Sequence, residues 1–184
     1  VIKCELPDTG DICRVFGPRV PNGSELDRGA PFLSINRNKK AITLNFHYAR
    51  GQEIFRQLAR RVDVVLQNFR PGALDKWQIG YEAIRAVKPD IVYVSISCLG
   101  QWGPLSYKIG YDTDAQAMGG IMSITGQADG PPTKTGHASI DYLTGVKAAQ
   151  AALAALVRRL RTGEGQHVDV AMVDCALAVT EGGM

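Results

Sequence analysis

The sequence predicts an α/β fold in which a doubly wound, mostly parallel sheet carries helices on both faces. Two observations support this prediction. Short apolar, β-branched runs alternate along the chain with segments whose apolar residues recur at helical spacing. The strand-like runs 62–66 and 91–96 are also apolar at nearly every position, which is typical of strands that helices bury on both sides.

The strand-like runs follow one another at short intervals. Strands are predicted over residues 1–6, 32–36, 41–46, 62–66, 91–96 and 167–171. The run 32–36 and the run 41–46 flank the basic turn 37–40, which predicts two strands joined by that turn. A polar loop rich in Gly and Pro separates the first strand from residue 30.

The helical segments lie between these runs. Helices are predicted over residues 50–61, 81–87, 112–122 and 142–160. The longest of them, 142–160, has an apolar stripe at helical spacing and ends at Thr162-Gly163-Glu164-Gly165, where glycine is expected to stop a helix. No internal repeat, low-complexity segment or domain linker is evident.

Composition narrows the class of protein. The 184 residues are 45% hydrophobic and 21% charged with a net charge of +3, and the basic residues are spread along the chain, so a nucleic-acid partner is not indicated. No apolar run is expected to reach the length of a membrane span. The four cysteines lack CxxC or metal-ligand spacing, which predicts free thiols in a reducing compartment.

Both ends suggest a longer protein. The chain starts without Met inside a strand-like run, and it stops just after a new helical pattern begins near residue 179. We therefore expect residues 1–184 to be a fragment.

Asp141 is the first candidate for chemistry, because it stands where the longest predicted helix begins. Asp is a good helix N-cap, and that structural role alone explains its presence. A carboxylate can also act as a nucleophile that forms an acyl intermediate, and a helix N-terminus is expected to lower its pKa. Periodicity does not separate the two interpretations.

Two loops are the expected ligand site, because ligands of parallel sheets bind beyond the carboxyl ends of the strands. They are residues 67–74 and 98–111. The turn after the strand 62–66 carries Asn68, Phe69 and Arg70, with Lys76 nearby, and it suits either a phosphate and adenine contact or an ordinary solvated turn. The basic turn 36–40 likewise suits either the phosphates of a nucleotide or an ordinary solvated turn. No GxGxxG or P-loop motif occurs.

Several short motifs occur in a fixed order along the chain. They are residues 1–5 (VIKCE), 36–40 (NRNKK), 68–74 (NFRPGAL), 103–104 (GP), 110–112 (GYD), 130–132 (GPP), Asp141 and 162–170 (TGEGQHVDV). Taken together, the ordered set resembles the class III CoA-transferases (the CaiB/BaiF-like family), which include formyl-CoA transferase, carnitine CoA-transferase and α-methylacyl-CoA racemase.

The resemblance implies an architecture. Residues 1–184 match part of the large Rossmann-like domain of that family, while the small domain, the first strand and a glycine-rich catalytic loop lie outside them. It also implies an interlocked homodimer in the cytoplasm, or in mitochondria in a eukaryote. Acyl-CoA and a small carboxylic acid are the implied partners, with coenzyme A as substrate, no permanently bound cofactor, no metal, no nucleic acid and no membrane.

The resemblance also implies site residues. The nucleophile of the transferases falls on Asp141, which takes an acyl group from the thioester. The implied CoA contacts are Leu44, Asn45, Phe46, His47, Asn68, Phe69, Arg70, Lys76, Ile109, Gly110, Tyr111 and Asp112. Leu6 and His47 depart from the family pattern, which often has Arg and Lys at these positions.

Tyr111 distinguishes the branches of that family. It lies 30 residues before Asp141. By the resemblance, the racemases of the family have a His at this position. Proton transfer on both faces of a carbon needs two groups of suitable pKa, and Tyr titrates near 10. A transferase is therefore favoured over a racemase. The third alternative is a truncated chain that binds CoA without catalysis.

Overall fold

The computed structural model describes residues 1–20 and 29–181. The chain divides into two compact units, Val1–Phe55 and Arg56–Met184, and the boundary falls inside helix α2 (Ala49–Ala59), where the sequence shows no linker. The loop predicted before residue 30 and the end of the chain fall partly on residues 21–28 and 182–184, outside the described residues.

The first unit contains a two-stranded parallel sheet. Strand β1 (Ile2–Glu5) pairs with β2 (Lys40–Thr43), and the segments between them include the short helices η1 (Ile12–Arg14) and α1 (Ala30–Ile35). The prediction of a strand at 32–36 is wrong, because these residues continue a helix whose first turn contains Pro31. Proline is well suited to that position, where a backbone N–H has no helical partner.

A buried ion pair stabilises this first unit. Glu5 is 7% exposed, and Arg14 binds both of its carboxylate oxygens at 2.7 and 2.8 Å. The Arg14 guanidinium also lies 3.9 Å from the centre of the Phe32 ring. The hydrogen bonds from Arg14 lower the pKa of Glu5, and the Asp11 backbone N–H adds to this effect at 3.0 Å from Oε2.

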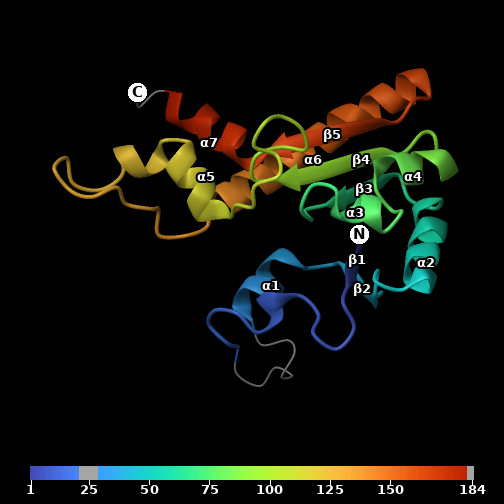
Figure 1. The fold of residues 1–184 in the computed structure, drawn as a ribbon. Helices are drawn as coiled ribbons and strands as arrows, with labels where there is room; N and C mark the ends of the chain where they lie inside the picture. The colour runs from blue at the N-terminus through green and yellow to red at the C-terminus, as the bar shows by residue number, and fades with distance from the viewer. Residues whose placement is uncertain (21–28, 182–184) are drawn as a thin grey trace. The chain divides into compact units, whose positions relative to one another are not determined.

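The second unit is built on a three-stranded parallel sheet in the order β3-β4-β5 (Figure 1). The strands are β3 (Val64–Gln67), β4 (Val92–Ser97) and β5 (Gln166–Ala171). The helices are α3 (Ala73–Lys76), α4 (Tyr81–Val87), α5 (Asp112–Met118), η2 (Ile121–Ile124), α6 (Ser139–Thr162) and α7 (Met172–Thr180).

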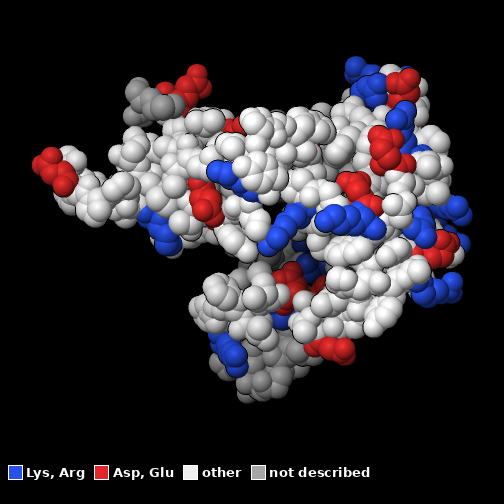
Figure 2. Space-filling model, viewed as in Figure 1, with Lys and Arg blue, Asp and Glu red and all other residues white. Residues whose placement is uncertain are grey.

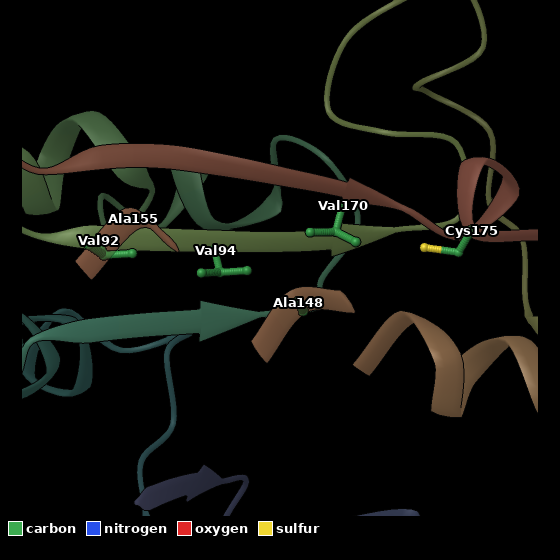
Figure 3. Packing of buried hydrophobic residues seen from close by; sticks show 6 residues of the cluster. All are labelled: Val92, Val94, Ala148, Ala155, Val170 and Cys175. Atoms are coloured by element: carbon green, nitrogen blue, oxygen red, sulfur yellow. The ribbon is translucent and has the colours of Figure 1, made fainter. Parts of the chain in front are cut away.

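Helices cover both faces of this sheet. Val92 and Val94 of β4 and Val170 of β5 pack against Ala148 and Ala155 of α6 on one face (Figure 3). On the other face, Tyr81 of α4 contacts the rings of Tyr93 and His167. The predicted parallel α/β fold with helices on both faces is therefore confirmed. The central strand β4 is buried over residues 92–95, as its continuous apolar composition indicates, whereas Leu66 of β3 is exposed.

Several helices differ from the prediction. Helix α7 already spans Met172–Thr180, whereas the last helical pattern was expected to begin near residue 179. The helix expected over 112–122 stops at Met118, because Gly119 ends α5 and Gly120 has a φ of 84°, after which η2 begins. Helix α6 starts at Ser139, and Gly163 follows its last residue with a φ of 77°. Short helix α3 was not predicted, since four residues show no periodicity.

Helix α6 also corrects the expectation that no segment is long enough to cross a membrane. Its 24 residues meet that criterion by length and composition. One of its faces packs against the sheet, and a core helix of this length meets the same criterion, so the finding is weak evidence for a membrane span.

The charged side chains match the mixed pattern of the sequence. Lys and Arg are interspersed with Asp and Glu on the face drawn in Figure 2. Among the described residues, Cys4, Cys98 and Cys175 form no disulfide, and Cys98 and Cys175 are buried.

Candidate active site at the start of helix α6

Asp141 lies in the first turn of α6, but it is not the N-cap. The N-cap residue is Ala138, which provides no side-chain hydrogen bond, and Ser139 and Ile140 precede Asp141 in the helix. The N-cap interpretation of Asp141 is therefore wrong. Its side chain is exposed, so the carboxyl is free of a capping role.

The capping role belongs to Asp112, the first residue of α5. Its Oδ1 accepts the backbone N–H of Ile140 at 2.7 Å and that of Asp141 at 3.0 Å. These are two of the N–H groups that a helix start leaves without helical partners. Asp112 thus holds the start of α6 from a separate helix.

Gln116 completes this arrangement from the next turn of α5. It is fully buried, its Nε2 donates to Asp112 Oδ2, and its Oε1 accepts the Thr135 N–H at 2.9 Å. Both oxygens of Asp112 are therefore engaged by protein donors, and the loop before α6 is tied to the same side chain. Sequence analysis missed Gln116; its position one turn after Asp112 in a predicted helix was the available signal.

The electrostatics of Asp141 differ from those expected at a helix N-terminus. Partial burial among its neighbours, followed by the negative charge of Asp112, raises the pKa of the Asp141 carboxyl. The expected lowering by the helix dipole is therefore corrected. The reasons are the partial burial of the carboxyl and, second, the Asp112 carboxylate, which already occupies the N–H groups at the positive end of α6.

Contacts place the start of α6 at the carboxyl edge of the sheet. Ile140 packs in one buried cluster with Cys98, which directly follows β4. Burial and the charges of Asp114 and Asp141 raise the pKa of the Cys98 thiol, so Asp141 lies close enough to act on it. Asp141 is therefore at the edge where a parallel sheet binds ligands.

The turn that follows β3 reaches the same edge, since β3 and β4 are neighbouring parallel strands. Asn68, Phe69 and Arg70 are exposed there. The Phe69 N–H donates to Gln67 Oε1 at 2.6 Å, and the Phe69 ring meets Trp77 edge-on at 5.7 Å. Lys76 is exposed at the end of α3. These side chains are accessible to a ligand.

The loop after β4 is anchored to the sheet. Asp169 Oδ2 of β5 accepts the Gln101 N–H at 2.8 Å. Further along, Gly110 approaches Cys98 so closely that a Cβ at this position would lie 2.4 Å from Cys98 Sγ. Ile109 and Tyr111 are 51% and 73% exposed, whereas Asp112 is buried.

The remaining predicted contacts belong to the other unit. Leu44, Asn45, Phe46 and His47 follow β2. Asn45 Oδ1 accepts the His47 N–H at 3.0 Å, and Phe46 meets Phe55 edge-on at 5.2 Å. The structure thus brings Asp141 and the 68–70 turn to one sheet edge, while the contact of residues 44–47 with CoA stays a prediction. Among residues 1–20 and 29–181, no three side chains of His, Cys, Asp or Glu gather as metal ligands.

Fold and site together define a class: a parallel α/β protein with an exposed carboxylate at its ligand-binding edge. The model of CoA-transferase family III matches residues 1–184, and the chain belongs to this family. The resemblance found in the ordered motifs is therefore confirmed.

Several named proteins are similar to this chain over nearly all of its length. Succinyl-CoA:glutarate CoA-transferase from Mus musculus is 43% identical over 178 residues, which cover 97% of this chain and 40% of that protein. Formyl-CoA:oxalate CoA-transferase from Streptomyces avermitilis is 45% identical over 177 residues, covering 96% and 42%. The crystal structure of a CAIB/BAIF family protein from Brucella suis superimposes with a TM-score of 0.92 at 41% identity, covering 98% and 48%. The chain spans less than half the length of each.

Proposed function

We propose that this chain belongs to an enzyme that transfers coenzyme A from an acyl-CoA to a carboxylic acid, with Asp141 as the nucleophile. The supporting observation is the exposed Asp141 carboxyl in the first turn of α6, at the carboxyl edge of the sheet, in a member of CoA-transferase family III. Relatives named as CoA-transferases for glutarate, mesaconate and oxalate support small dicarboxylates as acids.

The first half of the reaction forms the enzyme thioester. The Asp141 carboxylate attacks the thioester carbonyl of the donor, the C–S bond breaks, and CoA thiolate leaves behind an aspartyl–acyl anhydride. The thiolate then attacks the aspartyl carbonyl of this anhydride. An aspartyl-CoA thioester forms and the donor acid leaves as its carboxylate.

The second half runs the same chemistry in reverse. The acceptor carboxylate attacks the aspartyl-CoA carbonyl, which releases CoA thiolate and forms a new anhydride. The thiolate attacks the acceptor's acyl carbon, giving the acceptor's CoA thioester and a free Asp141 carboxylate. A raised pKa makes Asp141 a more basic nucleophile than an ordinary aspartate, provided that it stays deprotonated.

The start of α6 contributes little to oxyanion stabilisation in this proposal. The N–H groups of Ile140 and Asp141 are bound by Asp112, and that of Tyr142 donates to the Ala138 carbonyl at 3.3 Å. Donors for the developing oxyanion therefore come from another part of the protein.

CoA is proposed to bind along the carboxyl edge. Arg70 and Lys76 are exposed cations suited to its phosphates, and Asn68 and Phe69 offer an amide and a ring. The segment Ile109, Gly110 and Tyr111 is proposed to lie near the thioester. Residues 44–47 are proposed as further contacts. Asp112 acts here as a support for Asp141, because its oxygens are already occupied.

A racemase is not favoured. Tyr111 stands where that reaction needs a second acid–base group, and the comparisons named above are with CoA-transferases. An interlocked homodimer and a location in the cytoplasm belong to the same proposal. Light scattering of the intact protein and fractionation of its host cells test these two points.

The decisive experiment is Asp141→Ala in the intact protein, assayed with a panel of acyl-CoA donors and dicarboxylate acceptors. Transfer is expected to fall about 10⁴-fold or more, while CoA still binds. Asp129→Ala is the matched control, because it removes an exposed carboxylate from a loop away from the helix start. Retained transfer in Asp141→Ala would remove Asp141 as the nucleophile. Hydroxylamine trapping of the wild type with donor is expected to modify Asp141.

A further inference from the structure

A row of polar side chains crosses the sheet behind the proposed CoA-binding turn, with Gln67 and Ser95 buried and His167 half-buried. Gln67 of β3 and Ser95 of β4 are paired in the sheet, and Gln67 Nε2 donates to Ser95 Oγ at 2.9 Å. Ser95 Oγ lies 2.8 Å from His167 Nε2 of β5. The other end of the Gln67 amide, Oε1, accepts the Phe69 N–H. The row thus links His167 to the turn.

The donors and acceptors along this row can be assigned from the groups at its ends. Phe69 N–H can only donate, so Gln67 Oε1 faces it and Gln67 Nε2 faces Ser95. Ser95 Oγ already accepts from Gln67, and its single hydrogen finds an acceptor in His167 Nε2. Because Ser95 is 1% exposed, leaving that hydrogen without a partner is costly. Every donor in the row therefore has an acceptor when His167 is neutral and carries its proton on Nδ1.

The surroundings of His167 favour the neutral ring. Tyr81 stacks on the ring with centroids 4.8 Å apart, and Tyr93 and Trp102 meet it edge-on, both at 5.6 Å. Burial lowers the pKa of His167, although the charges of Asp169 on β5, Asp75 on α3 and Glu82 on α4 act in the opposite direction. Among the described residues, the groups whose charge acts on the ring are these three carboxylates, and the phenols of Tyr81 and Tyr93 contact it.

We propose that His167 is a positioning residue for coenzyme A, which acts through Ser95 and Gln67 to hold the 68–70 turn in its binding conformation and releases it on protonation. This inference rests on the proposed function, since it assumes that the turn binds CoA. A protonated His167 donates from Nε2, so Ser95 Oγ would face two donors and lose the acceptor of its own hydrogen. Gln67 then loses its fixed orientation, and with it the Phe69 N–H bond.

The test measures CoA affinity of the intact protein by calorimetry between about pH 5 and pH 8, the range in which a histidine titrates. In His167→Gln, a side-chain oxygen can still accept from Ser95 but does not titrate. This variant is expected to keep wild-type affinity near pH 8. Below the pKa of His167, wild type is expected to weaken progressively relative to it. The titration of CoA's own phosphates affects both proteins equally and cancels in the ratio.

Two further variants break the row without substituting any residue of the 68–70 turn. His167→Leu and Ser95→Ala are each expected to weaken CoA binding about tenfold near pH 8, as for one lost hydrogen bond of average strength. Ser123→Ala is the matched control for Ser95→Ala, because it removes an exposed hydroxyl bonded only to the Gly120 carbonyl. If Ser95→Ala fails to fold, the comparison of wild type with His167→Gln still decides the matter.

The outcomes separate this inference from the proposed function. If wild type does not bind CoA at any pH, the proposed function fails. If CoA binds and Arg70→Ala weakens it, but the ratio of wild type to His167→Gln is constant with pH, only the role of His167 is overturned. If Arg70→Ala binds CoA as wild type does, the turn is not the CoA site and the inference fails with it.

Discussion

The carboxylate of Asp112 binds the backbone of Asp141, with Oδ1 3.0 Å from the Asp141 nitrogen, while its negative charge acts on the Asp141 side chain. One buried carboxylate therefore does two things to the proposed nucleophile. It holds the first turn of α6 in place, and it raises the pKa of the carboxyl that this turn presents. Two variants test these effects.

The charge effect is tested by Asp112→Asn. The amide oxygen can still accept from Ile140 and Asp141. The negative charge is gone, and the new NH2 group faces the Gln116 Nε2 donor, so the Gln116 bond is lost as well. Since Asp112 raises the pKa of Asp141, its removal lowers that pKa, and more of Asp141 is ionised in acid. The acid limb of the pH–rate profile for CoA transfer is expected to move to lower pH. A reduced rate at neutral pH is also expected, because the carboxylate becomes less basic.

The control for that experiment is Asp129→Asn, which makes the same change of charge at an exposed loop position. Its acid limb is expected to coincide with that of wild type. An unmoved limb in Asp112→Asn would show that Asp112 does not influence the ionisation of Asp141.

The structural effect is tested by Gln116→Leu. Leucine has a similar volume but leaves Asp112 Oδ2 and the Thr135 N–H without their partner. The free energy of unfolding is expected to fall by about 3 kcal/mol, the upper range for a buried polar group left unsatisfied. CoA transfer is expected to fall while CoA affinity stays unchanged. Denaturant titration and kinetics measure the two; Gln127→Leu, at an exposed position, should leave both as in wild type.

Close packing at Gly110 gives a third prediction. In Gly110→Ala the new methyl group meets Cys98 Sγ and, at 2.9 Å, Cys98 Cβ, so the 98–111 loop or the end of β4 has to move. A loss of about 2 kcal/mol of stability is expected, as for overpacked cores. Thermal unfolding measures this loss.

Two other glycines are candidates for the control. Gly103→Ala offers no such clash, since nothing lies within 4 Å of a Cβ placed there, but the φ of 101° at Gly103 adds backbone strain. Gly136→Ala is therefore the cleaner control, because it has neither problem. Equal stability of Gly110→Ala and Gly136→Ala would contradict the close approach.

The ion pair of the first unit gives a prediction about acid. Arg14 holds the folded pKa of Glu5 below the value in the unfolded chain. The pair therefore stabilises fully above the unfolded pKa, and this contribution disappears as the pH falls through the folded pKa. Arg14→Met leaves a buried carboxylate without its partner and is expected to cost about 3 kcal/mol at pH 7.

The pH dependence is the sharper measurement for this pair. The difference in unfolding free energy between wild type and Arg14→Met is expected to shrink as the pH falls through the folded pKa of Glu5, which Arg14 holds below its ordinary value. Arg37→Met, at an exposed position, serves as the control. A difference that stays constant down to pH 3 would mean that the pair does not account for the loss.

Local sequence patterns predicted much of the fold. Helix α4 has the predicted bounds, and strands β3, β4 and β5 lie within or beside the predicted strand runs 62–66, 91–96 and 167–171. The run 32–36 was misread because β-branching and apolar content do not separate a six-residue helix from a strand. Pro31 was the sequence signal that favours the helix.

The sequence by itself determined the family, the alternation of strands and helices, and Asp141 as the residue on which the proposed chemistry depends. Only the tertiary structure decided that Asp112 caps α6, that Gln116 supports it, and that Gln67, Ser95 and His167 form one row. The physical reason is distance along the chain. Asp112 and Ile140 are 28 residues apart and Ser95 and His167 are 72 apart, so no local spacing encodes hydrogen bonds that form only after the sheet and its helices have packed.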